Sequence, residues 1–383
     1  MSDEKNYSDN IVDFTKIEPW NTRECAIKVN SIRCNQDYTL LTLGTSKGYR
    51  IFLTSTLRPA HQPTDEVNKL GDINIAMSYY KSSLVFLLPS RYNQDNKSRE
   101  IIVFDDFYQK EFASFKEKSE DILNFFVSKN VVFIITLCKI IVLEIFTFKI
   151  IDIINNINSM NQLLSYNYFD NIAYTDLKDK KRIFLRYYHN ENNKIVSHSK
   201  KSITYNFDYV QTFQLSRSGH ILAIVSIYGN KIHLYYTQNG ELKDCLLISQ
   251  YMETIVKVLF SEKSNYLFVL KIDNKFNIYK IQKEKVNKPK CVCSKYDDSK
   301  VEPQIKEENN SGIFGYFRKY SKNKDLKDAH AYSEIEGELS LVYFDKNKNK
   351  DLILINKNGQ YIKYQLKKKP CGHISPSLCI QWE

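Results

Sequence analysis

Cysteine and histidine residues toward the C-terminal end are the first candidates for chemistry in this sequence. The residue types that bind zinc occur there as Cys291, Cys293, Cys371, His373 and Cys379. Their spacing matches no structural zinc pattern, in which closely paired ligands recur at a second fixed interval. The motifs of serine hydrolases, zinc proteases, P-loop enzymes and dinucleotide-binding proteins are also missing from the sequence. We therefore expect no metal site, no cofactor and no enzymatic activity.

A second candidate set alternates aromatic and basic residues in the stretch GIFGYFRKY, residues 312–320. Aromatic rings can lie at the boundary of a lipid bilayer while neighbouring cations contact anionic headgroups. The candidate membrane-contact residues are Phe314, Tyr316, Phe317, Arg318 and Lys319. The same pattern also fits a β-strand of the protein core, so the sequence leaves both interpretations open.

The composition favours a large folded protein in a reducing compartment. With 43% hydrophobic and 13% aromatic residues, the chain is too apolar to be disordered. Its eight cysteines have no disulfide-framework spacing, and residues 1–20 resemble neither a secretory nor a transit signal. The net charge of +11 permits contact with nucleic acid or anionic membranes. The cysteine usage and the composition of residues 1–20 predict a cytoplasmic protein. Because the basic residues form no continuous patch in the sequence, we expect no binding of nucleic acid.

The most apolar segment is VVFIITLCKIIVLEIFTFKIIDII, residues 131–154. A transmembrane helix needs about 20 nearly uncharged residues, whereas Lys139, Glu144, Lys149 and Asp152 interrupt this segment. Valine, isoleucine and phenylalanine dominate it, as is typical of buried strands. We therefore predict strands and no membrane span.

Short apolar segments separated by polar turns make up most of the chain, and no segment has a sustained helical period. Similar turns at 35–39, 216–220 and 261–265 each precede an apolar strand, a short turn and another strand. The last two turns are about 45 residues apart, which fits the blade of a β-propeller. Without the tail and an irregular insertion, about 320 residues remain, enough for about seven blades. We predict an all-β, seven-bladed propeller, with 188–200 as a polar link between strands.

Two stretches point to a particular propeller family. Residues 34–52 read as a hairpin in which Asn35-Gln36-Asp37 precedes the first strand and Gly48-Tyr49-Arg50-Ile51-Phe52 follows the turn. Residues 71–106 begin with Gly71-Asp72-Ile73 and end with an apolar run followed by two aspartates. These stretches resemble the first two blades of the PROPPIN family, WIPI-like and WD-repeat-like propellers that bind phosphoinositides in autophagy. The segment 358–364, NGQYIKY, is similar to the closing strand of that family.

PROPPINs carry a Phe-Arg-Arg-Gly motif between blades five and six, and each arginine serves one headgroup pocket. The guanidinium group suits this role because it stays charged and binds phosphate through two hydrogen bonds. Gly240-Glu241 and the strand 255–260 fix the alignment on both sides of the motif. The four motif positions then fall on Leu246, Leu247, Ile248 and Ser249. Both arginines are replaced by aliphatic residues.

Other headgroup positions of the family are mostly replaced as well. The histidine that precedes the fifth-blade strand falls on Asn206. Ser226 alone matches a headgroup-contacting hydroxyl, and it can equally be a turn residue. His233 and Lys243 lie nearby in the sequence but match no motif position.

The resemblance implies a non-catalytic, monomeric scaffold or adaptor at autophagic, endolysosomal or vacuolar membranes. It would recruit autophagy or lipid-transfer proteins, with binding of phosphatidylinositol 3-phosphate weakened or lost. Two alternatives remain: a phosphoinositide-binding effector with a non-standard site, and a protein-binding propeller unrelated to autophagy. We expect a flexible tail at 1–19, a propeller at 20–368 with a mobile blade-six insertion at 283–312, and a C-terminal tail at 369–383.

Overall fold

The structure is a computed structural model of the 383-residue chain. It describes residues 27–61, 63–90, 99–157, 163–177, 179, 181–191, 194–205, 209–249, 251–281, 331–335, 339–344, 351–356, 360–366, 372–374 and 376–381.

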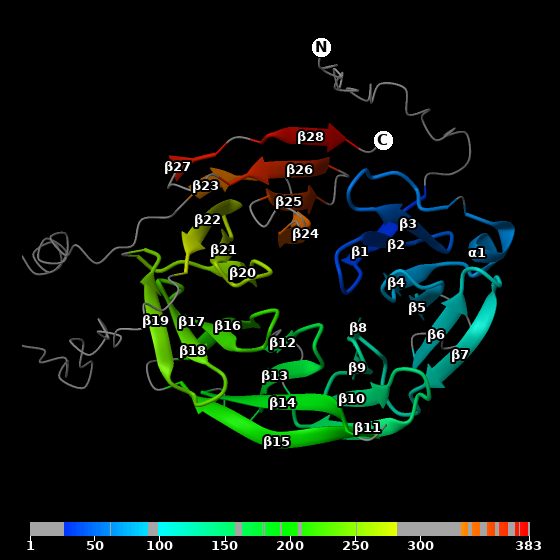
Figure 1. Ribbon diagram of the computed structural model, residues 1–383, viewed down its shortest axis with the longest axis horizontal. Coiled ribbons are helices and arrows are strands. Elements are labelled where there is room, and N and C mark those ends of the chain that lie inside the picture. Colours follow the sequence, from blue (N-terminus) through cyan, green and yellow to red (C-terminus); the bar gives the residue numbers. More distant parts are fainter. Residues whose placement is uncertain are drawn as a thin grey trace, which may run out of the picture.

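Seven β-sheets form a closed ring, as Figure 1 shows, and each sheet is one blade. Blade one consists of β1 (Val29–Cys34), β2 (Leu40–Thr45) and β3 (Tyr49–Leu53). Blade two consists of β4 (Ile73–Ser78), β5 (Leu84–Pro89), β6 (Glu100–Asp105) and β7 (Lys110–Lys116). Blade three consists of β8 (Asn124–Val127), β9 (Val131–Ile135), β10 (Lys139–Glu144) and β11 (Ile150–Asn155). The predicted propeller and its seven blades are confirmed.

The remaining blades follow around the ring. Blade four consists of β12 (Leu164–Tyr166), β13 (Asn171–Thr175), β14 (Arg182–Glu191) and β15 (Lys194–Thr204). Blade five consists of β16 (Val210–Leu215), β17 (Ile221–Ser226), β18 (Lys231–Tyr236) and β19 (Leu242–Leu247). Blade six begins with β20 (Ile255–Phe260), β21 (Tyr266–Lys271), β22 (Lys275–Lys280) and β23 (Ala331–Glu334). Blade seven begins with β24 (Leu339–Phe344), β25 (Asp351–Asn356) and β26 (Gln360–Gln365).

The C-terminal stretch 369–383, expected as a tail, carries two further strands. β27 (Gly372–His373) pairs in parallel with β23 of blade six, and β28 (Leu378–Gln381) pairs antiparallel with β26 of blade seven. This pairing satisfies backbone groups at the outer edges of two sheets, which an unpaired tail would leave exposed. The described chain otherwise holds one short helix, α1 (Asp65–Lys69), between blades one and two.

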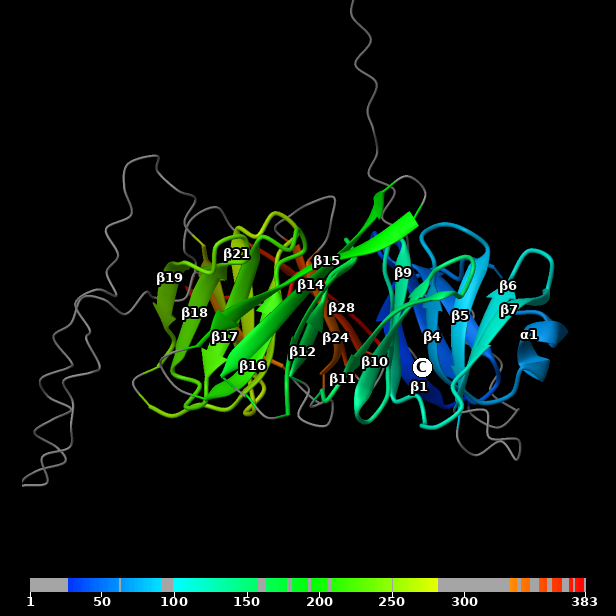
Figure 2. The ribbon, with the colours of Figure 1, turned by 90° about the horizontal axis from the view of Figure 1, so that it is seen from below.

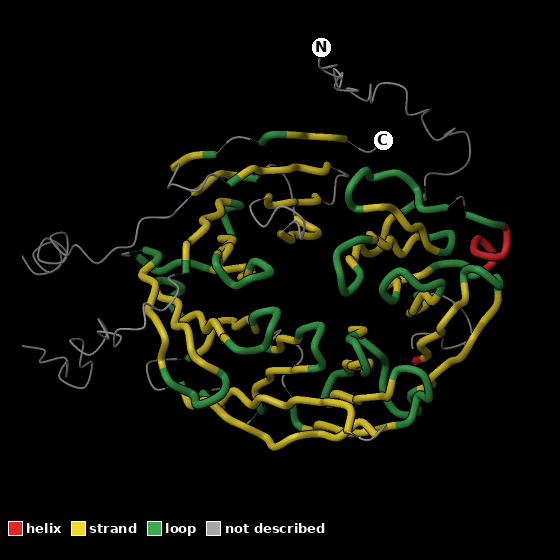
Figure 3. Tube along the Cα trace, viewed as in Figure 1, coloured by secondary structure: helices red, strands yellow, loops and turns green. Residues whose placement is uncertain are grey.

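One segment differs clearly from the sequence expectation. The predicted polar link at 188–200 is instead the far end of the long β14–β15 hairpin, whose pairing continues from Glu191↔Lys194 back to Arg182↔Thr204. In Figure 2 the end of this hairpin projects beyond the neighbouring strands, and Figure 3 shows how strands dominate the whole trace. Tyr188 is buried, but the side chains of 189–191 and 194–197 are partly or fully exposed, because the backbone of this outer hairpin pairs without burying them.

The hydrophobic core is divided among the junctions between adjacent blades. Within the described part of the chain there are seven buried clusters, and each contains residues of two neighbouring blades. Between blades three and four, for example, Phe133 packs with Ile172 and Tyr188. The apolar segment 131–154 forms β9, β10 and most of β11, as predicted. Among the described residues, no helix is long and apolar enough to cross a membrane.

The turn at 46–48 requires glycine for two reasons. Gly48 has a φ of +71°, a left-handed conformation that glycine adopts without steric cost. A Cβ atom at this position would also lie 2.1 Å from the carbonyl oxygen of Val67, in α1. The turn is therefore in direct contact with α1, which connects blade one to blade two.

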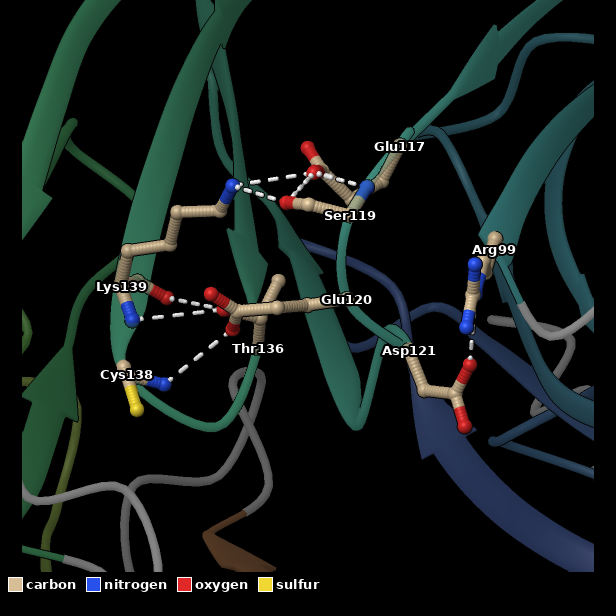
Figure 4. Close-up of polar contacts among 8 residues, drawn as sticks. All are labelled: Arg99, Glu117, Ser119, Glu120, Asp121, Thr136, Cys138 and Lys139. Carbon is tan, nitrogen blue, oxygen red and sulfur yellow. Dashed lines mark hydrogen bonds and ion pairs between the residues drawn. The ribbon is translucent and has the colours of Figure 1, made fainter.

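A buried ion pair joins blades two and three at their outer side. The Lys139 ammonium lies 2.9 Å from the Glu117 carboxylate and 3.0 Å from the Ser119 hydroxyl, as Figure 4 shows. The Glu117 side chain is 9% exposed. Burial alone would raise the pKa of Glu117, but hydrogen bonds from Ser119 and the charge of Lys139 outweigh it and lower this pKa to about 2.

We predict that this pair stabilises the fold above pH 5 and ceases to do so in acid. The pKa of Glu117 is lower in the folded than in the unfolded chain, so its contribution is present above the unfolded pKa and is lost as the pH falls toward about 2. Lys139→Met should lower the free energy of unfolding at pH 7 by on the order of 1–2 kcal/mol. In urea denaturation, this difference from wild type should shrink between pH 5 and pH 2. The exposed pair Lys69–Glu66 gives the control, Lys69→Met, which should change stability little. A difference that is constant with pH would contradict the assignment.

Candidate functional site

The four positions aligned with the PROPPIN arginine motif, residues 246–249, lie where blade five ends and blade six begins. Leu246 is fully buried on β19, and Ile248, just after this strand, is 8% exposed. Both pack with Ile255 and Val258 of β20 in the cluster between the two blades. Leu247 is only half-buried, because successive side chains of a strand point to opposite faces. Two of the motif positions therefore close the junction between the blades.

Ser226 lies close to these positions, as the sequence alignment implied. Its hydroxyl donates to the side-chain oxygen of Asn230 at 3.2 Å, in the turn between β17 and β18. The backbone carbonyl of Asn230 accepts from the backbone N–H groups of Ile248 at 2.7 Å and Ser249 at 3.4 Å. The structure thus brings Ser226 and the end of the motif together around one turn residue. Ser226 is 4% exposed and bonded within that turn, which favours its interpretation as a turn residue.

The two cation candidates of blade five already have hydrogen-bond partners. The imidazole Nδ1 of His233 lies 2.8 Å from the hydroxyl of Tyr205, and burial together with the charge of Lys231 lowers the pKa of His233 to about 4. His233 is therefore neutral at pH 7. The Lys243 ammonium donates to the hydroxyl of Tyr236 at 2.7 Å and lies over the same ring. Neither side chain replaces the missing arginines.

An exposed apolar face lies over blades five and six, and the sequence patterns did not identify it. We call it the blade 5–6 face and define it by Tyr209, Ile227, Tyr228, Tyr251, Met252 and Ile272, which are 40–73% exposed. Backbone hydrogen bonds connect its loops. Ile227 N–H donates to Tyr209 at 2.7 Å, the N–H of Glu253 donates to Tyr228 at 2.7 Å, and the N–H of Ile272 donates to Thr254 at 2.9 Å.

Gly229 fixes the arrangement of this face. Its φ is +64°, and a Cβ atom there would lie 1.7 Å from the carbonyl oxygen of Glu253. The β17–β18 turn is therefore in direct contact with the linker that carries Tyr251 and Met252. The Glu253 carboxylate pairs with the Lys271 ammonium at 2.9 Å, so the charges at the centre of the face balance each other. An aromatic residue beside Gly229 and a Tyr-Met pair in a linker were the sequence signals available for this site.

Several predicted site residues lie outside the described residues. These are Asn206 and the membrane-contact candidates Phe314, Tyr316, Phe317, Arg318 and Lys319, together with the insertion 283–312, which falls between β22 and β23 of blade six. The same holds for Cys291, Cys293 and Cys371. Within the described part of the chain, no group of cysteine, histidine and acidic side chains could hold a metal ion.

No protein-family model and no curated protein sequence matches the chain. Solved structures do match. Hsv2 from Kluyveromyces lactis aligns with a TM-score of 0.70 and 11% identity over 94% of this chain and 100% of that chain. Hsv2 from Kluyveromyces marxianus aligns with a TM-score of 0.67 and 12% identity over 94% of this chain and 100% of that one. A complex of KlAtg21 with the coiled coil of AgAtg16 aligns with a TM-score of 0.65 and 12% identity over 93% of this chain and 100% of that one.

Hsv2 and Atg21 are PROPPINs. The resemblance inferred from blades one and two is thus confirmed at the level of the fold, and the low identity indicates a divergent sequence.

Because Ile248 is buried and Leu247 is only half-buried, arginine substitutions at these two positions should change the free energy of unfolding by different amounts. Ile248→Arg places a charge in the apolar junction and should lower the free energy of unfolding by more than about 3 kcal/mol. Leu247→Arg lies on the half-exposed face of β19 and should change it by less than about 1 kcal/mol. Chemical denaturation measures both, with Ile248→Val as a size control expected to cost about 1 kcal/mol. An Ile248→Arg variant as stable as wild type would mean that this position opens to solvent.

Proposed function

We propose that this protein is a non-catalytic, PROPPIN-like scaffold, whose propeller binds protein partners and has lost headgroup-specific phosphoinositide binding. The observation that carries the proposal is the burial of Ile248, at the second arginine position, in the junction between blades five and six. Leu247, at the first arginine position, is a half-buried aliphatic side chain that offers phosphate no hydrogen bond. The hydroxyl of Ser226 is also bonded within its own turn.

The blade 5–6 face is the surface that we propose for a protein partner. Contiguous exposed apolar side chains on a soluble domain mark interaction sites, and tyrosine and methionine are enriched in protein interfaces. An anionic bilayer would be attracted by unpaired cations, whereas Lys271 at this face is neutralised by Glu253. A protein is therefore the better occupant. Among the structural neighbours, KlAtg21 is seen in complex with a coiled coil of AgAtg16, and we propose a partner of the same autophagy-related class here.

A second candidate function is membrane contact through residues 313–320, which follow the insertion in the sequence. The aromatic and basic residues at 313–320 favour it, because rings and cations together suit a bilayer interface. In this case the protein would associate peripherally with autophagic or endolysosomal membranes, without recognising one headgroup.

We predict that the purified protein binds phosphatidylinositol 3-phosphate no better than other anionic lipids of equal charge. Two missing charge-assisted contacts, on the order of 1.5–3 kcal/mol each, amount to most of a micromolar affinity. Liposome flotation at matched charge and salt is the measurement. Leu247→Arg combined with Ile248→Arg should not restore specificity, because position 248 is buried between blades and Asn206 also departs from the family pattern. A clear preference of the wild-type protein for the 3-phosphorylated headgroup would overturn the proposal.

We further predict that any flotation with anionic liposomes depends on residues 313–320 and not on the blade 5–6 face. Binding through Arg318 and Lys319 should fade with increasing salt, because salt screens exposed charges. Phe314→Ser with Phe317→Ser should abolish flotation. Tyr251→Ser with Met252→Ser, the matched change on the blade 5–6 face, should leave it unchanged. If only the second double variant fails to float, the face is a membrane surface and the assignment to a protein partner is wrong.

A further inference from the structure

In the part of the chain that the structure describes, blade one has one strand fewer than the other blades, and a loop takes the place of the missing strand. Its sheet contains β1, β2 and β3 in this order, whereas the other six sheets contain four or five strands each. Residues 58–60, which we call the closing segment, pair with the outer edge of β3. The N–H of Leu53 donates to the carbonyl of Arg58 at 2.9 Å, and the N–H of Ala60 donates to the carbonyl of Ile51 at 2.8 Å.

The closing segment is attached to β3 by backbone hydrogen bonds and not by side-chain burial. All three of its side chains are exposed, so it buries no apolar group against the strand. Pro59 has no N–H and cannot act as a donor. The preceding residue, Leu57, has a φ of +56°, which is unfavourable for a bulky side chain. The closing segment therefore depends on a further attachment.

This attachment lies directly after the closing segment, in the connection that leads from blade one to α1 (Figure 3). The imidazole Nε2 of His61 lies 3.0 Å from Oδ2 of Asp106, in the turn between β6 and β7 of blade two. The other carboxylate oxygen of Asp106 accepts from the hydroxyl of Tyr49, on β3. The hydroxyl of Thr64 donates to the side-chain oxygen of Gln109 in the same turn. One carboxylate thus connects the end of the closing segment, the edge strand of blade one and blade two.

The carboxylate of Asp106 is charged at neutral pH, whereas a histidine gains or loses its charge between about pH 5 and pH 8. Burial alone would raise the pKa of Asp106, but hydrogen bonds from His61 and Tyr49 outweigh it and lower this pKa. Tyr49 stays neutral, because burial and the neighbouring carboxylates raise its pKa. The side chains of His61 and Asp106 are 33% and 15% exposed, so water screens their attraction only in part. A protonated His61 therefore adds an ionic attraction to the hydrogen bond.

The other charged groups around this pair keep their charge in the same pH range. The elements beside the pair are the closing segment, β3, α1 and the β6–β7 turn with the start of β7. Carboxylate, ammonium and guanidinium groups do not change their charge between pH 6 and pH 8. The charged side chains that these elements carry besides Asp106 are Arg50, Arg58, Asp65, Glu66, Lys69, Asp105 and Lys110.

We propose that the His61–Asp106 pair is a pH-dependent latch that closes the outer edge of blade one. With His61 protonated, the ion pair and the hydrogen bond together hold the closing segment on β3. With His61 neutral, the hydrogen bond alone remains, and the closing segment opens more often. Opening exposes the N–H of Leu53 and the carbonyl of Ile51, an edge with which another strand can pair. This latch does not depend on the proposed function.

Hydrogen–deuterium exchange of the full-length protein measures this opening, read by mass spectrometry on peptides that cover residues 49–61. Dividing each rate by that of the unfolded sequence at the same pH removes the intrinsic pH dependence of amide exchange. The amides of Leu53 and Ala60 should then exchange about threefold faster at pH 8 than at pH 6, because a partly exposed ion pair adds only modest stability. Equal corrected rates at the two pH values would overturn the proposal.

Two variants assign the effect to the pair. His61→Gln keeps a hydrogen-bond donor but carries no charge, so its corrected rates should be equal at pH 6 and pH 8 and match the faster rate of wild type. Asp106→Asn removes the carboxylate and should also abolish the pH dependence. In both variants the amides of β9 should stay as protected as in wild type, which shows that the propeller is folded.

His189→Gln is the matched control, because His189 pairs with Glu191 at the far end of the β14–β15 hairpin. This variant should retain the wild-type rates and their pH dependence at residues 53 and 60. If His61→Gln also retains that pH dependence, another group controls the opening and the assignment of the latch is wrong.

Discussion

One turn of blade one connects the ring across its centre, and the arrangement of the blades depends on it. Gln36, in the turn between β1 and β2, donates to the carbonyl of Val127 in blade three at 3.0 Å. Its side-chain oxygen accepts from the N–H of Tyr80 in blade two at 2.7 Å. Asn35 donates to the carbonyl of Tyr80 at 2.8 Å. These bonds are buried or partly buried, where losing one partner leaves the other without a replacement in water.

Tyr38 extends the same connection to the remaining blades. Its ring stacks on Tyr343 of blade seven and contacts Tyr168 of blade four edge-on. Arg217 of blade five lies over this ring and reaches within 3.4 Å of Glu262 of blade six. Tyr38 adopts a φ of +57°, which is uncommon for a bulky residue and costs of order 1 kcal/mol. The contacts with three other blades offset this strain.

The sequence determined the fold class, the inner strands and the turns that join them. Strands such as β9 and β21 are buried on both faces, so they read as continuous apolar runs between polar turns. The outer strands β7 and β15 were harder to predict, because an exposed strand keeps its backbone pairing without an apolar pattern. The absence of arginine from residues 246–249 is also evident from the sequence itself.

Only the tertiary structure decided what these positions do. In the sequence, Leu246 and Ile248 cannot be distinguished from other strand residues. The structure shows that they pack against blade six. The loops of the blade 5–6 face are brought together by hydrogen bonds between turns and linkers of different blades. Arg33 of β1 reaches Asn124 of β8, in blade three, only because closing the ring brings these two blades together. The physical reason is the same in each case: local patterns report which side chains must be buried, whereas ring closure decides which distant residues become neighbours.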